Sequence, residues 1–282
     1  MGNVMFEGSE GTLVGAIHRS STSAGTILLL HGGGQTRHSW RRTGDHLAEA
    51  GWTTLAYDAR GHGDSDWAFD YSIDALADDL AKVVAQLDDV PVVVGASMGG
   101  LTALLGLGEL KIPATSLVLV DITPQAEPAG VQRVLDFMGS APDGFASLED
   151  AADAIAQYNP HRPRPKSADG LRKNLRQRRA DGRWYWHWDP RFLEFGPLHA
   201  ELIRSERLRD AARAIDVPTM LVRGAYSDVV SDVGTTALSE AIPHLHMSDA
   251  DAGHMVAGDD NTVFANGLLG FLNDEVRRPP LS

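Results

Sequence analysis

The chain has 282 residues, of which 43% are hydrophobic and 22% are charged, which is ordinary for a globular protein in water. A formal net charge of -13 argues against nucleic acid and anionic membranes as partners. The absence of cysteine excludes disulfides, thiol nucleophiles and cysteine-ligated zinc. The N-terminal stretch does not resemble a signal peptide, and every apolar run is far shorter than the ~20 residues of a membrane helix. We therefore expect a cytoplasmic protein.

Short apolar runs alternate with helical patterns along most of the chain. The runs predict strands at 12–18, 26–31, 53–58, 91–96, 115–121, 218–224 and 244–250. Helical spacing predicts helices at about 37–50, 74–89, 101–110, 231–242 and 261–276. The apolar runs do not alternate with polar residues, so both faces of the sheet are expected to be buried.

This alternation predicts an α/β fold, in which right-handed βαβ units build a mostly parallel sheet with helices on both faces. The first apolar runs precede any helix, and we expect them to form an antiparallel hairpin at one edge of the sheet.

The alternation of strands and helices stops between residues 125 and 207, because this segment has no strong strand pattern. We expect a mostly helical cap, inserted after the sixth strand, over a core domain made of residues 1–124 and 208–282. The middle of this segment, 161–192, carries ten Arg or Lys against three Asp. We favour a solvated helix face that pairs with the acidic body over a nucleic-acid-binding surface. The aromatic cluster Trp184 to Trp188 is more often packing, but a cap has to line the pocket beneath it, so Trp186 and Trp188 are candidate pocket residues.

Ser97 lies in Gly-Ala-Ser-Met-Gly, between a predicted buried strand and a predicted helix. Gly-x-Ser-x-Gly in this position is the nucleophile elbow, a tight turn that exposes the serine hydroxyl at the edge of the sheet. The alternative is a serine that caps a helix in a glycine-rich turn. The strand before Ser97 and the helix after it favour the nucleophile.

A serine hydroxyl needs a base near neutral pH, and His254 is the candidate because it follows the last predicted strand. The alternative is an ordinary loop histidine. An acid should lie between Ser97 and His254 in the chain order of this fold class. We prefer Asp228, in the loop after the strand at 218–224, and keep Asp121, at the end of the strand at 115–121, as its competitor.

The run His31-Gly-Gly-Gly-Gln35 follows the strand at 26–31. Its glycines let backbone amides approach a substrate, and an oxyanion hole needs one amide after the nucleophile and one from such a loop. We therefore predict Met98 and Gly33 as donors, with Gly34 next to them. His31 is expected to anchor the loop, and both His31 and Gln35 are candidate pocket residues. The alternative is a flexible glycine turn.

Together these stretches resemble the α/β-hydrolase superfamily, in the serine-nucleophile branch with a helical cap. The resemblance covers nearly all the chain outside the cap and rests on HGGGQ (31–35), YDARGHGDSD (57–66), GASMGG (95–100), RGAYSDVVS (223–231) and AGHMVAG (252–258). It implies Ser97 as nucleophile, His254 as base and Asp228 as acid. It also implies that the loop containing Arg60 and His62 braces the site. Epoxide hydrolases of this superfamily carry a carboxylate at the elbow, so Ser97 conflicts with that activity.

The resemblance implies a serine hydrolase that cleaves a small carboxylic ester or lactone through an acyl-enzyme. Two alternatives stay open: a C–C bond hydrolase or lyase on the same triad, and a non-catalytic ligand-binding protein. Cap arginines could favour an acidic substrate. We expect no cofactor and no metal, and the partner expected is a small-molecule substrate rather than nucleic acid or a membrane. A homo-oligomer remains open.

Overall fold

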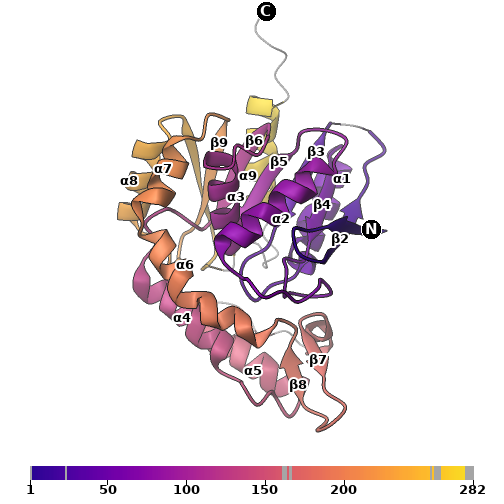
Figure 1. Cartoon of the computed structure of the whole chain (residues 1–282). Coiled ribbons are helices and arrows are strands. Elements are labelled where there is room, and N and C mark those ends of the chain that lie inside the picture. The colour runs from indigo at the N-terminus through magenta and orange to yellow at the C-terminus, as the bar shows by residue number, and fades with distance from the viewer. Residues whose placement is uncertain are drawn as a thin grey trace, which may run out of the picture.

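The computed structural model describes residues 2–22, 24–160, 164, 167–254, 256 and 262–276. Its centre is an eight-stranded sheet in the order β1-β2-β4-β3-β5-β6-β9-β10 (Figure 1). The strands are β1 (Gly2–Glu7), β2 (Thr12–His18), β3 (Thr26–Leu30), β4 (Thr53–Tyr57), β5 (Val92–Ala96), β6 (Ser116–Val120), β9 (Thr219–Gly224) and β10 (Leu245–Ala250). Seven of these eight strands match a predicted strand to within one residue at each end.

The sheet is parallel from β4 to β10 and antiparallel only at the edge where β1 and β2 lie. The antiparallel hairpin therefore exists, but it consists of β1 and β2. The first two predicted strands, β2 and β3, do not pair, because β4 lies between them. Pattern reading missed β1 because this edge strand has one buried side chain, that of Phe6.

Helices cover both faces of the sheet. One face carries α2 (Ile73–Ala85), α3 (Met98–Gly108), α7 (Glu206–Arg213) and α8 (Asp232–Ala241), and the other carries α1 (Arg41–Glu49) and α9 (Thr262–Phe271) (Figure 1). Alternate residues of one strand pack on opposite faces. Leu28 and Leu30 of β3 pack in the core beneath α2, α3, α7 and α8, whereas Ile27 and Leu29 pack in the core beneath α1 and α9. Both faces are thus buried, as the uninterrupted apolar runs predict.

The chain between β6 and α7 forms a layer beside the sheet (Figure 1). It contains α4 (Pro128–Gly139), α5 (Leu148–Tyr158), η2 (Asp169–Lys173), η3 (Pro190–Phe195) and α6 (Gly196–Ile203). It also holds a small antiparallel pair, β7 (Leu175–Gln177) and β8 (Trp184–Trp186), where the sequence predicts helix. The basic stretch is thus largely a turn-and-hairpin segment, although 161–163 and 165–166 lie outside the described residues.

This insertion follows the sixth strand, as predicted. Its predicted end at residue 207 falls inside α7, which packs against α3 and α8 of the sheet's own helical layer. A short 3-10 turn, η1 (Arg37–Trp40), precedes α1, and a π-helical turn, η5 (Leu272–Val276), follows α9.

Within the described ranges, no helix has the length and apolar character needed to cross a lipid bilayer.

Candidate active site

Ser97 occupies a strained turn between β5 and α3. Its φ of 48° is in the left-handed region, which a residue with a side chain seldom adopts and which recurs at functional sites. A β-carbon on Gly95 would lie 2.4 Å from the carbonyl oxygen of Gly99, and one on Gly99 would lie 2.6 Å from that of Leu30. Glycine is therefore required on both sides of Ser97 for the strand and helix to pass so closely. The turn is the predicted elbow.

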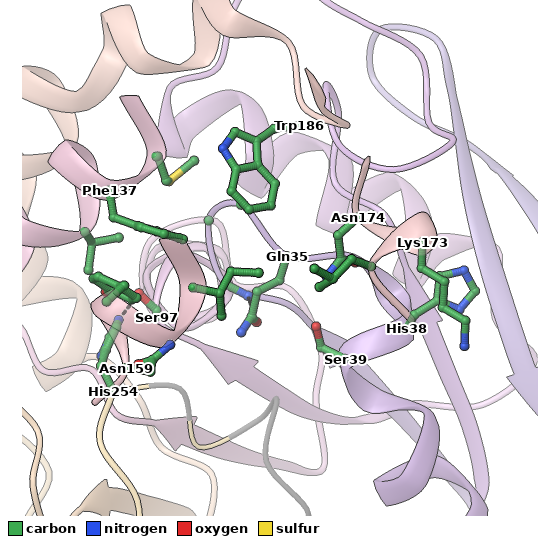
Figure 2. A pocket seen from close by; sticks show the side chains of 18 of the residues that line it. Gln35, His38, Ser39, Ser97, Phe137, Asn159, Lys173, Asn174, Trp186 and His254 are labelled. Carbon is green, nitrogen blue, oxygen red and sulfur yellow. Dashed lines mark hydrogen bonds between the residues drawn. The ribbon is translucent and has the colours of Figure 1, made fainter. Parts of the chain in front are cut away.

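His254 lies between the hydroxyl of Ser97 and a carboxylate (Figure 2). Its Nε2 is 3.0 Å from Ser97 Oγ, and its Nδ1 is 2.7 Å from Asp121 Oδ2. Because a carboxylate only accepts, the Nδ1–H donates to Asp121 and leaves Nε2 to accept the Ser97 proton. The side chains of His254 and Asp121 are 8% and 0% exposed, so water competes little for this hydrogen bond.

The hydrogen bond between His254 and Asp121 corrects the preference for Asp228 that was drawn from the sequence. Asp121 follows β6 directly with a φ of 50°, and its carboxylate also accepts from the Gly224 amide and the Ser227 hydroxyl. Asp228 instead pairs with Arg133 of α4, whose guanidinium lies 2.6 Å from its Oδ2. Asp228 is the wrong carboxylate for His254, because its loop turns the side chain toward the insertion.

The predicted oxyanion donors are the backbone amides of Met98 and Gly33, with Gly34 beside them. Met98 is the first residue of α3, so its N–H has no acceptor within the helix. Among the described residues, none accepts a hydrogen bond from the amide of Gly33. Gly34 differs from the prediction, because its amide donates to Nε2 of His62 at 3.2 Å. The amide of Gly34 therefore supports the loop, unlike that of Gly33 among the described residues.

Buried neutral histidines hold the glycine loop from below. His31 accepts from the Ala59 amide and donates to the Gly32 carbonyl, as the predicted anchor should. His187 accepts from the Gly63 amide and donates to the Gly34 carbonyl. Burial lowers the pKa of His31 to about 4 and that of His62 to about 3. Burial also holds the pKa of His187 well below its ordinary value. These rings are therefore uncharged near neutral pH and support the loop through hydrogen bonds.

The loop that follows β4 braces this arrangement. Asp58 is fully buried and accepts from the backbone and the guanidinium of Arg37. Arg60 forms a two-point ion pair with Asp79, with N–O distances of 2.7 and 2.8 Å. Since neither Arg60 nor His62 faces the cavity beside Ser97, the structural role expected for them fits their contacts.

A cavity of about 390 Å³ opens beside Ser97 and His254, within the range of small-molecule sites. One wall comes from the insertion: Val134, Phe137, Met138, Ile155, Ala156 and Tyr158. The predicted pocket residues Gln35, Trp186 and Trp188 line it, and Figure 2 shows Trp186 and Gln35 around the space beside Ser97. His31 does not line the cavity, because its ring is taken up in anchoring the glycine loop.

Sequence reasoning did not single out the wall residues of α4 and α5. Phe137 stacks on Tyr158 with ring centroids 4.2 Å apart and meets Trp186 edge to face. Their helical spacing resembles that of any buried helix face, so the sequence holds no signal that separates pocket from core here. In the described ranges, no cluster of three or more His, Asp or Glu side chains is arranged to hold a metal ion.

Comparison with known proteins agrees with this architecture. The family model described as "alpha/beta hydrolase fold" matches residues 25–260. The protein named "Esterase Rv0045c" from Mycobacterium tuberculosis is 32% identical over 262 residues, covering 89% of this chain and 84% of its own. "Lipase LipV" from the same organism is 31% identical over 239 residues, covering 82% and 86%.

Solved structures give the same fold. The structure of "E-2-(Acetamidomethylene)succinate Hydrolase" superposes with a TM-score of 0.83 at 22% identity, covering 96% of this chain and 98% of that chain. A structure of Rv0045c superposes with a TM-score of 0.71 at 28% identity, covering 96% and 91%. The sheet order, the insertion after β6 and the family match lead to one conclusion. The chain is a hydrolase that belongs to the α/β-hydrolase fold family.

Proposed function

We propose that this chain is a serine esterase that cleaves a small carboxylic ester or lactone through an acyl-enzyme. The observation that carries the proposal is the single imidazole of His254, which contacts both Ser97 and Asp121. The esterase and lipase named above support the same reaction class, since they match most of this chain.

In the first half of the reaction, Ser97 Oγ attacks the ester carbonyl carbon while Nε2 of His254 takes its proton. The imidazolium that forms is stabilised by the buried carboxylate of Asp121. The carbonyl oxygen gains negative charge and accepts from the amides of Met98 and Gly33. The C–O bond to the alcohol then breaks, and the alcohol leaves with the proton held on Nε2.

In the second half, water attacks the acyl-enzyme and gives its proton to Nε2 of His254. The tetrahedral intermediate again places its oxyanion at the two amides. Its collapse releases the carboxylic acid and returns the proton to Ser97 Oγ. A donor of this kind is worth ~3 kcal/mol of transition-state stabilisation, so the amide pair contributes much of the rate.

The proposal is tested by hydrolysis of p-nitrophenyl acetate, butyrate and octanoate, with Ser97→Ala as the matched inactive variant. We expect turnover by the wild type, loss of about 10⁶-fold in kcat in Ser97→Ala, and one adduct from a fluorophosphonate probe by intact mass. A clean adduct without ester turnover would favour the C–C bond hydrolase. Neither turnover nor adduct would favour a non-catalytic binding protein.

A further inference from the structure

The cavity beside Ser97 is basic, although the chain carries a net charge of -13. Four cationic side chains line it: Arg41, Arg42, Arg164 and Lys173. None of the described lining residues is an Asp or a Glu. A concave site lined by one sign of charge concentrates ligands of the opposite sign.

Two of these four cations, Arg41 and Lys173, are available for a ligand, because Arg42 and Arg164 already have interactions of their own. Arg164 is already paired with Asp153, at 2.6 Å. Arg37, which does not line the cavity, forms ion pairs with Asp58 and Asp64. By contrast, Arg41 and Lys173 have no carboxylate within ion-pair distance in the part of the chain that the structure describes.

These two cations lie at the end of the cavity away from the nucleophile. Figure 2 shows Ser97 and His254 on one side, and His38 with Lys173 on the other, beyond Gln35. Arg41 is three residues after His38 on the same helical run, so it shares that face. Burial, followed by the charge of Arg37 and then of Lys173, lowers the pKa of His38, and the ring is therefore neutral beside them. Ser39 and Asn174 add uncharged hydrogen-bonding groups to this end.

We propose that Arg41 and Lys173 form an anion-binding subsite for a carboxylate on the acyl part of the substrate. The inference rests on the proposed esterase function and names its substrate class, a half-ester of a dicarboxylic acid. The leaving alcohol takes its proton from His254, so it lies at the Ser97 end. The acyl chain is then the part that extends toward Lys173, where a terminal carboxylate gains charge-assisted hydrogen bonds.

The kinetic test uses mono-p-nitrophenyl esters of glutaric, adipic and suberic acids, each against the same ester with its free carboxylate methylated. For at least one chain length, we expect kcat/KM at low salt to be about tenfold higher for the anion. The preference should fall as salt is raised to ~0.5 M, because the far end of the cavity is solvent-accessible. Equal values for anionic and methylated esters at every length would overturn the proposal.

Substitutions at Arg41 and Lys173 test whether these two side chains cause the preference for the anionic ester. Arg41→Gln and Lys173→Gln should each lower the anion-to-neutral ratio by about threefold to tenfold, while Lys173→Arg retains it. Lys82→Gln, an exposed lysine of α2 outside the cavity, removes the same charge and should leave the ratio unchanged. Because both substrates are measured on one preparation, the folded fraction cancels. A ratio unchanged in both glutamine variants would contradict the assignment.

A binding measurement separates this inference from the proposed function. Calorimetry with Ser97→Ala should detect tighter binding of monomethyl adipate than of dimethyl adipate, and Lys173→Gln should reduce that difference. If no ester is hydrolysed but the anion binds better, the subsite stands and the esterase proposal fails. If esters are hydrolysed without any anion preference in kinetics or binding, the subsite is wrong and the esterase proposal stands.

Discussion

The two glycines that flank Ser97 leave no room for a β-carbon. The added carbon on Gly95 would meet backbone of Gly99 rather than a flexible side-chain end, so strand β5 and helix α3 would have to separate. Close packing of the strand and the helix and exposure of the Ser97 hydroxyl therefore both require glycine at position 95. The sequence could therefore predict the elbow, from the Gly-x-Ser-x-Gly motif together with the strand before it and the helix after it.

We predict that Gly95→Ala lowers the free energy of unfolding by about 1–3 kcal/mol and lowers kcat with it, because overpacking shifts the turn that aims Ser97. Urea unfolding and p-nitrophenyl butyrate turnover measure the two effects. Gly270→Ala in α9 is the matched control, since a β-carbon there meets nothing within 4 Å. Stability equal to wild type in Gly95→Ala would refute this account of the turn.

Pattern reading also located His254 and the HGGG loop, but not the acid. Asp121 and Asp228 both follow parallel strands at the same edge of the sheet, and their sequence contexts do not decide between them. The structure decides through backbone direction: the left-handed turn at Asp121 lets its carboxylate meet Gly224, Ser227 and His254. The residue type does not predict that turn, because both candidates are aspartates and equally able to adopt a positive φ.

At the scale of elements, the insertion supplies the wall that shapes the cavity. Arg133 of α4 ties it to the loop after β9 through Asp228, and it also contacts the carbonyl and ring of Tyr158. Helix α4 thus touches both the sheet's loops and α5. The sequence indicated an insertion, but its β7–β8 pair is only three residues per strand and gives no periodic signal.

Phe137→Ala should deepen the cavity and shift the preferred p-nitrophenyl ester toward longer acyl chains. The ring packs between Tyr158 and Trp186 in the cavity wall, so its removal enlarges the cavity beside Ser97. The ratio of kcat/KM for octanoate to that for butyrate should rise about tenfold, the effect of burying roughly two more CH₂ groups at ~0.8 kcal/mol each. Leu198→Ala, an exposed position of α6, should leave the ratio as it is. An unchanged ratio in Phe137→Ala would show that the acyl chain lies elsewhere.

At the scale of the whole molecule, buried histidines make the stability of the fold depend on pH. His31, His62 and His187 are buried and stay neutral in the folded chain down to acidic pH. In the unfolded chain they bind protons near pH 6.5. The unfolded state therefore takes up more protons below pH 6.5, and stability falls as pH decreases.

We predict a loss approaching 1.4 kcal/mol per pH unit for each of these histidines between pH 6 and 5, or about 4 for the three together. Carboxylates with lowered pKa values add to the loss only at lower pH. His187→Asn should reduce this slope by about one proton, because it removes one of the three buried rings. Urea unfolding at pH 7, 6 and 5 measures the slope. A slope near zero for the wild type would contradict neutral burial of the histidines.

The pairing of His254 with Asp121 is the central claim, and kcat/KM of Asp121→Asn beside Asp228→Asn tests it most directly. Asparagine at 121 keeps the shape but favours the wrong tautomer of His254, so we predict a loss of about 10³–10⁴-fold. Asparagine at 228 removes only a partly exposed ion pair with Arg133, so the loss should stay within about tenfold. The reverse result, an inactive Asp228→Asn and an active Asp121→Asn, would contradict the account.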